Sequence, residues 1–95
     1  MSYIDFHIKF SGHSLRRMFE RNIPIENVKN CIFYGMLIED YPDDKPYASN
    51  LKLMLFDNKP IHVVSATDYE NKIIYVITAY YPDTDKWCNN FSQRR

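Results

Sequence analysis

The first ten residues alternate between apolar and polar side chains. The apolar set is Ile4, Phe6, Ile8 and Phe10, and the residues between them are polar or charged. A period of two is typical of a strand that buries one face and leaves the other in water. The pattern therefore predicts a strand over residues 3–10.

After Ser11 the period changes to that of a helix. Steps of four residues advance about 40° around a helix, so His13, Arg17 and Arg21 share one face. Ser11 offers an N-cap, and Asn22 tolerates the left-handed conformation in which helices often end. We expect the opposite face to point at a core; it carries Leu15, Met18, Phe19 and Asn22.

A second helix is expected to follow Pro24, which the first turn of a helix accepts. Val28, Cys31 and Ile32 keep the spacing of an apolar helical face, and Gly35 supplies a stop. Beyond Gly35, four segments rich in β-branched and aromatic residues predict strands at 36–41, 51–56, 61–67 and 73–81. A short helix over Trp87–Arg95 is expected to close the chain.

The turns between the four later strands are short, which favours antiparallel hairpins. The expected architecture is α+β, with two N-terminal helices packed on one face of a mainly antiparallel twisted sheet in the order βααββββ. With 95 residues, 45% of them hydrophobic and only two glycines, the chain fits one ordered domain over residues 1–95.

Composition narrows the class of protein further. No apolar run approaches the roughly 20 residues of a membrane span, and the N-terminus lacks the pattern of a secretory signal, so we expect a cytoplasmic protein without a membrane partner. Cys31 and Cys88 are far apart and have no histidine at ligand spacing. We therefore expect reduced structural thiols, with neither a metal site nor a cofactor.

The formal net charge is zero, so a nucleic-acid partner must be recognised by local clusters of charge. Basic residues gather early in the chain and at its end. Acidic residues gather in between. The residues of the basic clusters are Arg16, Arg17, Arg21, Arg94 and Arg95, and those of the acidic clusters are Glu39, Asp40, Asp43, Asp44, Asp83 and Asp85.

Two histidines could meet. His62 lies at the start of an apolar strand and is either a buried structural residue or one wall of a pocket. If it meets the face of His13, Arg17 and Arg21, two imidazoles and two guanidiniums would surround one cleft. These groups suffice for cleavage of a phosphodiester without a metal, because histidine transfers protons near neutral pH and arginine binds phosphate oxygens in pairs.

Two residues near the end of the chain allow two interpretations each. Strict alternation places Tyr80 on the same side of its strand as Ile74, Val76 and Thr78. There it would either extend the core or place its phenol at the rim of the sheet. Arg94 is either part of a solvated terminus or a second basic group for RNA.

Three motifs in order make the chain resemble a family of small prokaryotic proteins that is catalogued as a domain of unknown function and is related to RelE-like toxins. The first motif is His-x3-Arg-Met-x-Glu-Arg-x-Ile, and the second is Pro-x-His-Val-Val. The third is Thr-x-Tyr-x-Pro-Asp followed by Trp and a terminal Arg. They correspond here to His13–Ile23, Pro60–Val64, and Thr78–Asp83 with Trp87 and Arg94 or Arg95.

The resemblance implies the helix-on-sheet fold of the barnase, EndoU, colicin and RelE group, most of whose characterised members are metal-independent ribonucleases. Many are toxins with a cognate antitoxin, and relatives of this family resemble partners of small proteins that carry a zinc finger and a helix-turn-helix. Carried over, His13 and His62 become acid and base, and Arg17 and Arg21 clamp the phosphate. Tyr80 and Arg94 support them in the site. The chain departs from the family's pattern in two ways. It has Asn22 where glycine is common, and its net charge is less basic than that expected of a ribosome-dependent toxin.

Three hypotheses follow. The first is an endoribonuclease toxin that cleaves RNA by attack of a ribose 2′-hydroxyl. The second is a catalytically inert module of the same fold that binds RNA or a protein. The third is structural: ion pairs of His13, Arg17, Glu20 and Arg21 tether the first helix to the acidic residues between Glu39 and Asp44.

Overall fold

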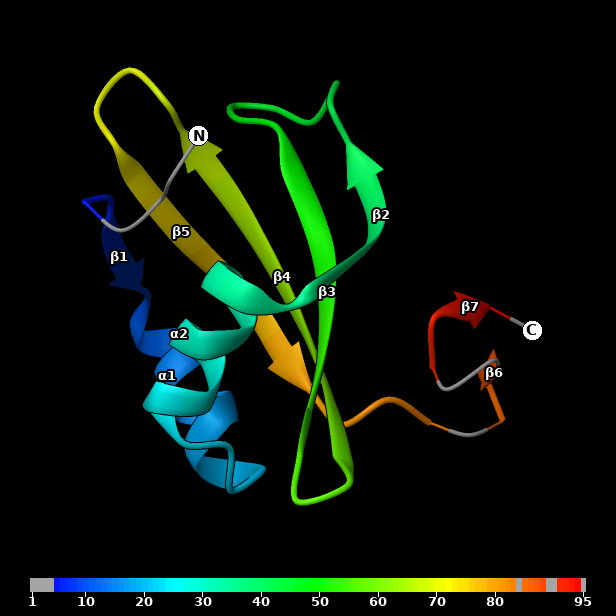
Figure 1. The fold of residues 1–95 in the computed structure, drawn as a ribbon. Coiled ribbons are helices and arrows are strands. Elements are labelled where there is room, and N and C mark those ends of the chain that lie inside the picture. The colour runs from blue at the N-terminus through cyan, green and yellow to red at the C-terminus, as the bar shows by residue number, and fades with distance from the viewer. Residues whose placement is uncertain (1–4, 84, 89–90, 95) are drawn as a thin grey trace.

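A five-stranded mixed sheet with two helices on one face forms the body of the protein (Figure 1). The computed structural model describes residues 5–83, 85–88 and 91–94. The helices are α1 (Gly12–Glu20) and α2 (Ile25–Tyr34). The strands are β1 (His7–Phe10), β2 (Met36–Tyr41), β3 (Ser49–Phe56), β4 (Lys59–Asp68), β5 (Ile73–Tyr80), β6 (Trp87–Cys88) and β7 (Gln93–Arg94).

The strands of the large sheet lie in the order β1-β5-β4-β3-β2. β2 to β5 form the antiparallel meander that the short turns predict, and β1 adds to β5 in parallel at the other edge. The α+β class is therefore confirmed, and the predicted order βααββββ is extended by β6 and β7. Of the strand predicted over residues 3–10, the part at His7–Phe10 is confirmed as β1, whereas residues 5 and 6 form a turn and a bend; residues 3 and 4 lie outside the described part of the chain.

The predicted ends of both helices are confirmed. The Ser11 hydroxyl accepts a hydrogen bond from the Ser14 backbone N–H at 3.0 Å, and Asn22 adopts the left-handed conformation with φ of 56°. Gly35 ends α2 with an ordinary negative φ of −71°. Its role is steric, because a Cβ there would lie against the Cys31 carbonyl oxygen and 2.9 Å from that of Leu53.

The core lies between the helices and one face of the sheet. α2 contributes its predicted apolar face, and β4 and β5 contribute alternate residues. The buried residues of this core are Phe6, Met18, Ile23, Val28, Cys31, Ile32, Ile61, Val63, Ile74, Val76 and Ala79.

The predicted burial of Phe19 is wrong, because its side chain is 84% exposed and that of Leu15 is 39% exposed. α1 packs mainly against β5 and buries Ser14 and Met18 instead. The Ser14 hydroxyl donates to the Ser11 carbonyl at 2.9 Å, so this small polar residue is satisfied inside the protein. A narrow contact with one strand buries a narrower stripe than the helical wheel predicts.

A β-bulge in β5 changes the side on which Tyr80 lies. Thr78 pairs with Val64 and Val76 pairs with Ser65, which leaves Ile77 as the extra residue between them. An extra residue reverses the alternation of side chains beyond it. The prediction that Tyr80 shares a side with Ile74 and Val76 is therefore wrong: these two face the helices, and Tyr80 faces away from them.

The described residues of the C-terminal segment do not form the predicted helix. β6 and β7 instead pair with each other in an antiparallel arrangement. Figure 1 shows them away from the two helices. Trp87 is buried and its ring contacts that of His62 at a centroid distance of 4.4 Å. The segment therefore covers part of the sheet face that the helices leave open. No described helix has the length and apolar character needed to cross a membrane.

Candidate functional site

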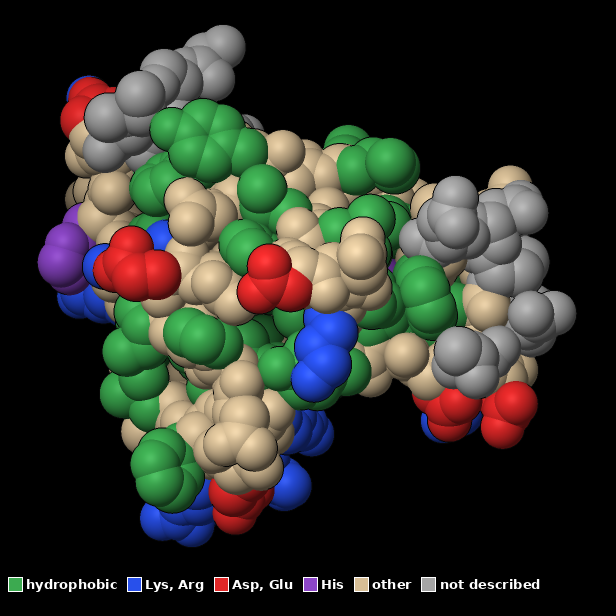
Figure 2. Space-filling view, turned by 60° about the horizontal axis from the view of Figure 1, so that its bottom comes forward, with side chains coloured by type: hydrophobic (Ala, Val, Ile, Leu, Met, Phe, Trp, Pro, Cys, Tyr) green, Lys and Arg blue, Asp and Glu red, His purple; other side chains and the backbone are tan. Residues whose placement is uncertain are grey.

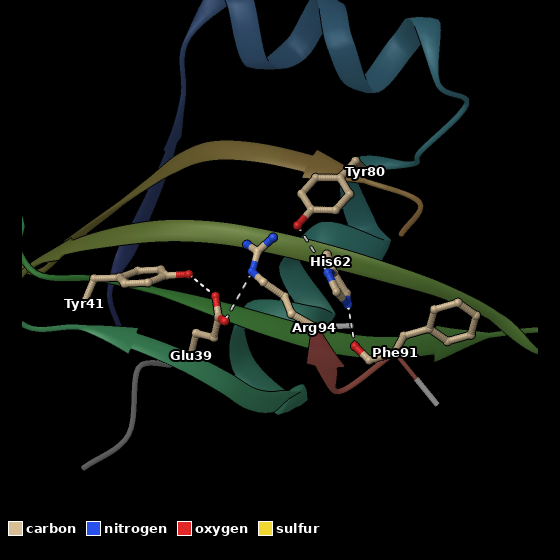
Figure 3. Close-up of polar contacts among 6 residues, drawn as sticks. All are labelled: Glu39, Tyr41, His62, Tyr80, Phe91 and Arg94. Atoms are coloured by element: carbon tan, nitrogen blue, oxygen red, sulfur yellow. Dashed lines mark hydrogen bonds and ion pairs between the residues drawn. The ribbon is translucent and has the colours of Figure 1, made fainter. Parts of the chain in front are cut away.

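Five side chains gather on the sheet face that points away from the helices (Figure 3). We call them the far-face cluster: Glu39 and Tyr41 from β2, His62 from β4, Tyr80 from β5 and Arg94 from β7. The register of the sheet explains their common face. His62 lies directly opposite Tyr80, and Leu53 and Leu51 lie opposite His62 and Glu39.

His62 is the buried centre of the cluster, with no exposed surface. Its Nε2 lies 2.8 Å from the carbonyl oxygen of Phe91, and its Nδ1 lies 3.2 Å from the hydroxyl of Tyr80. Because a carbonyl can only accept, Nε2 must carry the proton, and Nδ1 then accepts from Tyr80. Tyr80, His62 and Phe91 therefore form a directed chain of hydrogen bonds.

The protonation of this chain follows from its surroundings. Burial lowers the pKa of His62; the Phe91 carbonyl and Glu39 oppose that change, and the charge of Arg94 adds to it. Burial also raises the pKa of Tyr80, with Arg94 acting against the change and Glu39 adding to it. At neutral pH the imidazole is therefore uncharged and the phenol keeps its proton.

Arg94 supplies the positive charge of the cluster. Its Nε lies 3.5 Å from Glu39 Oε2, and its guanidinium carbon lies 4.7 Å from the centre of the Trp87 ring. The Tyr41 hydroxyl donates to the other oxygen of Glu39, and this bond raises the pKa of Tyr41. Since 58% of the Arg94 side chain is exposed, the guanidinium is held in place and still open to an anion.

The residues predicted on the first helix lie on the other side of the sheet. His13 is exposed on α1, and the Arg17 guanidinium is 3.9 Å from Glu20. Arg21 donates from Nη1 to the carbonyl oxygen of Ala79 at 2.8 Å. The predicted convergence of His13 and His62 on one phosphate is therefore wrong, because the sheet separates them.

The structural hypothesis is also corrected. Arg21 does tether α1 to the sheet, but through the Ala79 carbonyl at the end of β5 and not through an acidic side chain. The acidic partner expected for the helix, Glu39, pairs with Arg94 instead. Of the predicted site residues, the fold brings together His62, Tyr80 and Arg94 and leaves His13, Arg17 and Arg21 elsewhere.

Glu39 and Tyr41 are members of the site that sequence reasoning missed. Both lie on β2 two positions apart, so they point to the same face. A glutamate at an alternate position of a strand otherwise rich in apolar residues is the signal that could have found them. The signal is obscured because Glu39 begins a group of acidic residues that continues into the loop before β3.

Charges of both signs are interspersed over the face of the molecule in Figure 2. That view shows no broad surface of one sign, in line with the net charge of zero. Among the described residues, no three His, Cys, Asp or Glu side chains are grouped so as to hold a metal ion. The far-face cluster instead offers a neutral base, a phenol and a guanidinium, which can bind an oxyanion and move a proton.

The fold and this cluster define a small α+β domain with a polar site on the open face of its sheet. The chain belongs to the family described as Domain of unknown function (DUF4258), whose profile matches residues 10–81. The match includes His62 and Tyr80 and ends before Trp87 and Arg94. No match was found among curated proteins, and none among solved structures.

Proposed function

We propose that the protein is a metal-independent endoribonuclease, related to the RelE-like toxins, and that the far-face cluster is its active site. The hydrogen-bond chain from Tyr80 through His62 to Phe91, with Arg94 beside it, carries this proposal. A neutral buried imidazole behind a half-buried phenol is a proton acceptor that an RNA hydroxyl can reach through the phenol. Two helices on one face of a mainly antiparallel sheet also suit a RelE-like fold.

The proposed reaction moves one proton through Tyr80. The 2′-hydroxyl of the ribose gives its proton to the Tyr80 oxygen while Tyr80 passes its own proton to Nδ1 of His62. The freed 2′-oxygen bonds to phosphorus while the bond from phosphorus to the 5′-oxygen breaks, and the 5′-oxygen takes a proton from water. The hydroxide that remains takes the proton back from His62, which restores the neutral imidazole. Arg94 stabilises the negative charge that builds on the phosphorus oxygens. The products end in a 2′,3′-cyclic phosphate and a 5′-hydroxyl.

Each side chain then has a distinct role. Tyr80 and Arg94 contact the RNA and are the catalytic residues. His62 receives the proton through Tyr80, and Glu39 holds the guanidinium of Arg94 in place. His13, Arg17 and Arg21 have no part in the reaction, because they lie across the sheet from Tyr80.

The test is cleavage of mixed cellular RNA in EDTA, with product ends analysed, by the wild-type protein and two variants. Tyr80→Phe keeps the ring and removes the phenol, and should lower the rate by about 10²- to 10⁴-fold, the usual loss when a proton-transfer group is removed. His13→Ala is the matched control and should cleave at the wild-type rate. The assay is repeated on translating ribosomes; a wild-type protein inactive on both substrates would contradict the proposal, as would full activity of Tyr80→Phe.

A second candidate function is a protein-binding module, and exposed apolar side chains of α1 and the start of α2 favour it. Leu15, Phe19 and Ile25 line a groove of about 520 Å³ next to Arg16. Exposed apolar grooves with a polar rim are typical of protein contacts. We propose a partner protein there, such as a cognate antitoxin carrying a zinc finger and a helix-turn-helix. Its binding should be lost in Phe19→Glu and should change little with salt, whereas RNA binding weakens as salt rises.

A further inference from the structure

We infer that a pocket beside the far-face cluster binds one nucleobase of the RNA and thereby selects which base lies near the cleaved bond. The inference rests on the proposed function, since it takes the open face of the sheet as the surface that meets RNA. It adds a specificity site that is separate from the residues proposed to act on the phosphate.

The pocket lies on the same face of the sheet as the cluster and has a volume of about 390 Å³. Ser49, Ala66 and Tyr75 come from three adjacent strands and face the same way, because Ala66 is the register partner of both Ser49 and Tyr75. Ile77, the extra residue of the β5 bulge, and Pro46 from the loop before β3 also line it. This volume is at the lower end of small-molecule sites, and its lining is mainly apolar.

A pair of tyrosines gives the pocket a flat aromatic wall. The rings of Tyr47 and Tyr75 stack with centroids 5.6 Å apart and planes 8° from parallel. The charge of Asp68 and its hydrogen bond with Tyr47 raise the pKa of that tyrosine, so the phenol stays protonated and held. Asp68 is itself buried and is fixed by two hydrogen bonds from Asn71. A flat platform held in this way suits a planar ring, because proteins that bind single-stranded nucleic acid commonly stack its bases on aromatic side chains.

Two exposed charged residues, Asp44 and Lys45, also line the pocket. Asp44 is held by a hydrogen bond from the Ser49 hydroxyl. A carboxylate can accept from the amino group of a base, and an ammonium can donate to a base carbonyl. The pocket therefore combines a stacking surface with one acceptor and one donor, which is the combination that distinguishes bases by their edges.

The pocket is close enough to the cluster for one short RNA segment to reach both. Ser49 pairs with Tyr41, whose hydroxyl donates to Glu39. Leu51, two residues along β3, pairs with Glu39, and two residues of a strand span about 7 Å. A phosphate at Arg94 and a base in the pocket can thus belong to one short RNA segment. This continuity favours RNA over an unrelated small molecule.

The test measures binding of RNA trinucleotides that carry a 2′-deoxy sugar at the cleavable position, so that binding is separate from cleavage. All four bases are compared at each position, together with an abasic trinucleotide. The wild-type protein should prefer one base at one position and bind the abasic probe at least about tenfold more weakly. Ile77→Glu changes a wall residue that is 47% exposed, and should weaken binding of the preferred base about tenfold or more.

Tyr75→Leu is the second variant and should flatten the base preference by removing the stacking surface. Tyr34→Leu, at an exposed tyrosine on α2, is the matched control and should bind as the wild type does. Equal binding of abasic and base-containing probes would overturn the inference, as would an unchanged base preference in both pocket variants. If those results accompanied RNA cleavage, only the pocket would be refuted. Base-selective binding without cleavage would support the pocket and refute the endoribonuclease.

Discussion

His62 combines two properties at the scale of a single residue: it is fully buried, and both ring nitrogens have partners. A buried neutral histidine satisfied in this way is a stable part of the protein interior. The same arrangement leaves the nitrogen that faces Tyr80 without a proton, so His62 can also accept the proton in the proposed reaction. The sequence allows either a buried structural histidine or a residue of a site, and the proposed reaction uses both properties at once.

The lowered pKa of His62 makes the stability of the protein depend on pH. Above the ordinary histidine pKa of about 6.5 the imidazole is neutral in both folded and unfolded chains. As pH falls below that value, the unfolded chain binds a proton that the folded chain does not, so folding is penalised. Urea denaturation should show stability falling from pH 7 to pH 5. The fall should be smaller in His62→Gln, which leaves His7 and His13 unchanged; equal falls would refute the assignment.

Gly35 is required by close packing. A Cβ there would contact the Cys31 carbonyl oxygen and lie 2.9 Å from the Leu53 carbonyl oxygen, both of them backbone atoms. We expect Gly35→Ala to lower the free energy of unfolding by about 1–3 kcal/mol, the usual cost of overpacking.

Gly12→Ala is the control for that change, because nothing lies within 4 Å of a Cβ at Gly12. It should leave stability unchanged or raise it slightly, since alanine favours the helix. Thermal denaturation of both variants measures the difference. Equal stability of the two variants would show that a methyl group fits at position 35 without displacing its neighbours.

At the scale of elements, α1 is tied to the sheet at its C-terminal end. The guanidinium of Arg21 donates to the carbonyl oxygen of Ala79 near the end of β5. One turn earlier, the side chain of Met18 is buried in the core. A helix of nine residues with one narrow buried stripe depends on such a bond for its position.

Arg21→Ala should therefore lower the free energy of unfolding by about 1 kcal/mol, the usual net value of a hydrogen bond. Arg17→Ala should change it by less than about 0.5 kcal/mol, because the pair of Arg17 with Glu20 is 3.9 Å long and lies on the surface. Neither variant should alter RNA cleavage. Loss of cleavage in Arg17→Ala, with the fold intact, would show that the face of α1 that carries His13 and Arg17 takes part in the reaction.

At the scale of the whole molecule, charge neutrality limits how RNA can bind. With no excess of basic residues, the proposed site offers Arg94 as its main phosphate contact. The salt dependence of binding reports the number of phosphate contacts, with a slope of log K against log salt of roughly −0.7 per contact for a single strand.

We expect that slope to be shallow, about −0.7 to −1.5 for a short RNA, and to lose about 0.7 in Arg94→Gln. Affinity titrations at several salt concentrations measure it. A steep slope in the wild-type protein that Arg94→Gln leaves unchanged would place the phosphate contacts elsewhere. Arg16 and Arg17 on α1 would then be the next residues to replace.

The signals for both helices and for β1 to β5 are local, so these elements could be predicted from the sequence alone. Ser11 and Asn22 mark the ends of α1 through backbone geometry that neighbouring residues decide. Gly35 marks the end of α2, although its steric role also involves Leu53 of β3, which is distant in the sequence. The strands follow from alternation and from short turns, which also made antiparallel pairing the expected arrangement. His62, Tyr80 and Arg94 were recognised as residues whose chemistry suits a site.

Contacts between distant parts of the chain set which of these residues meet. One extra residue in β5 reverses the face of Tyr80, and the return of the C-terminal segment brings Arg94 and the Phe91 carbonyl to His62. The sheet meanwhile separates His13 from all of them. A bulge and a long-range chain return depend on contacts between residues distant in the sequence, and hydrophobic periodicity carries no information about those contacts.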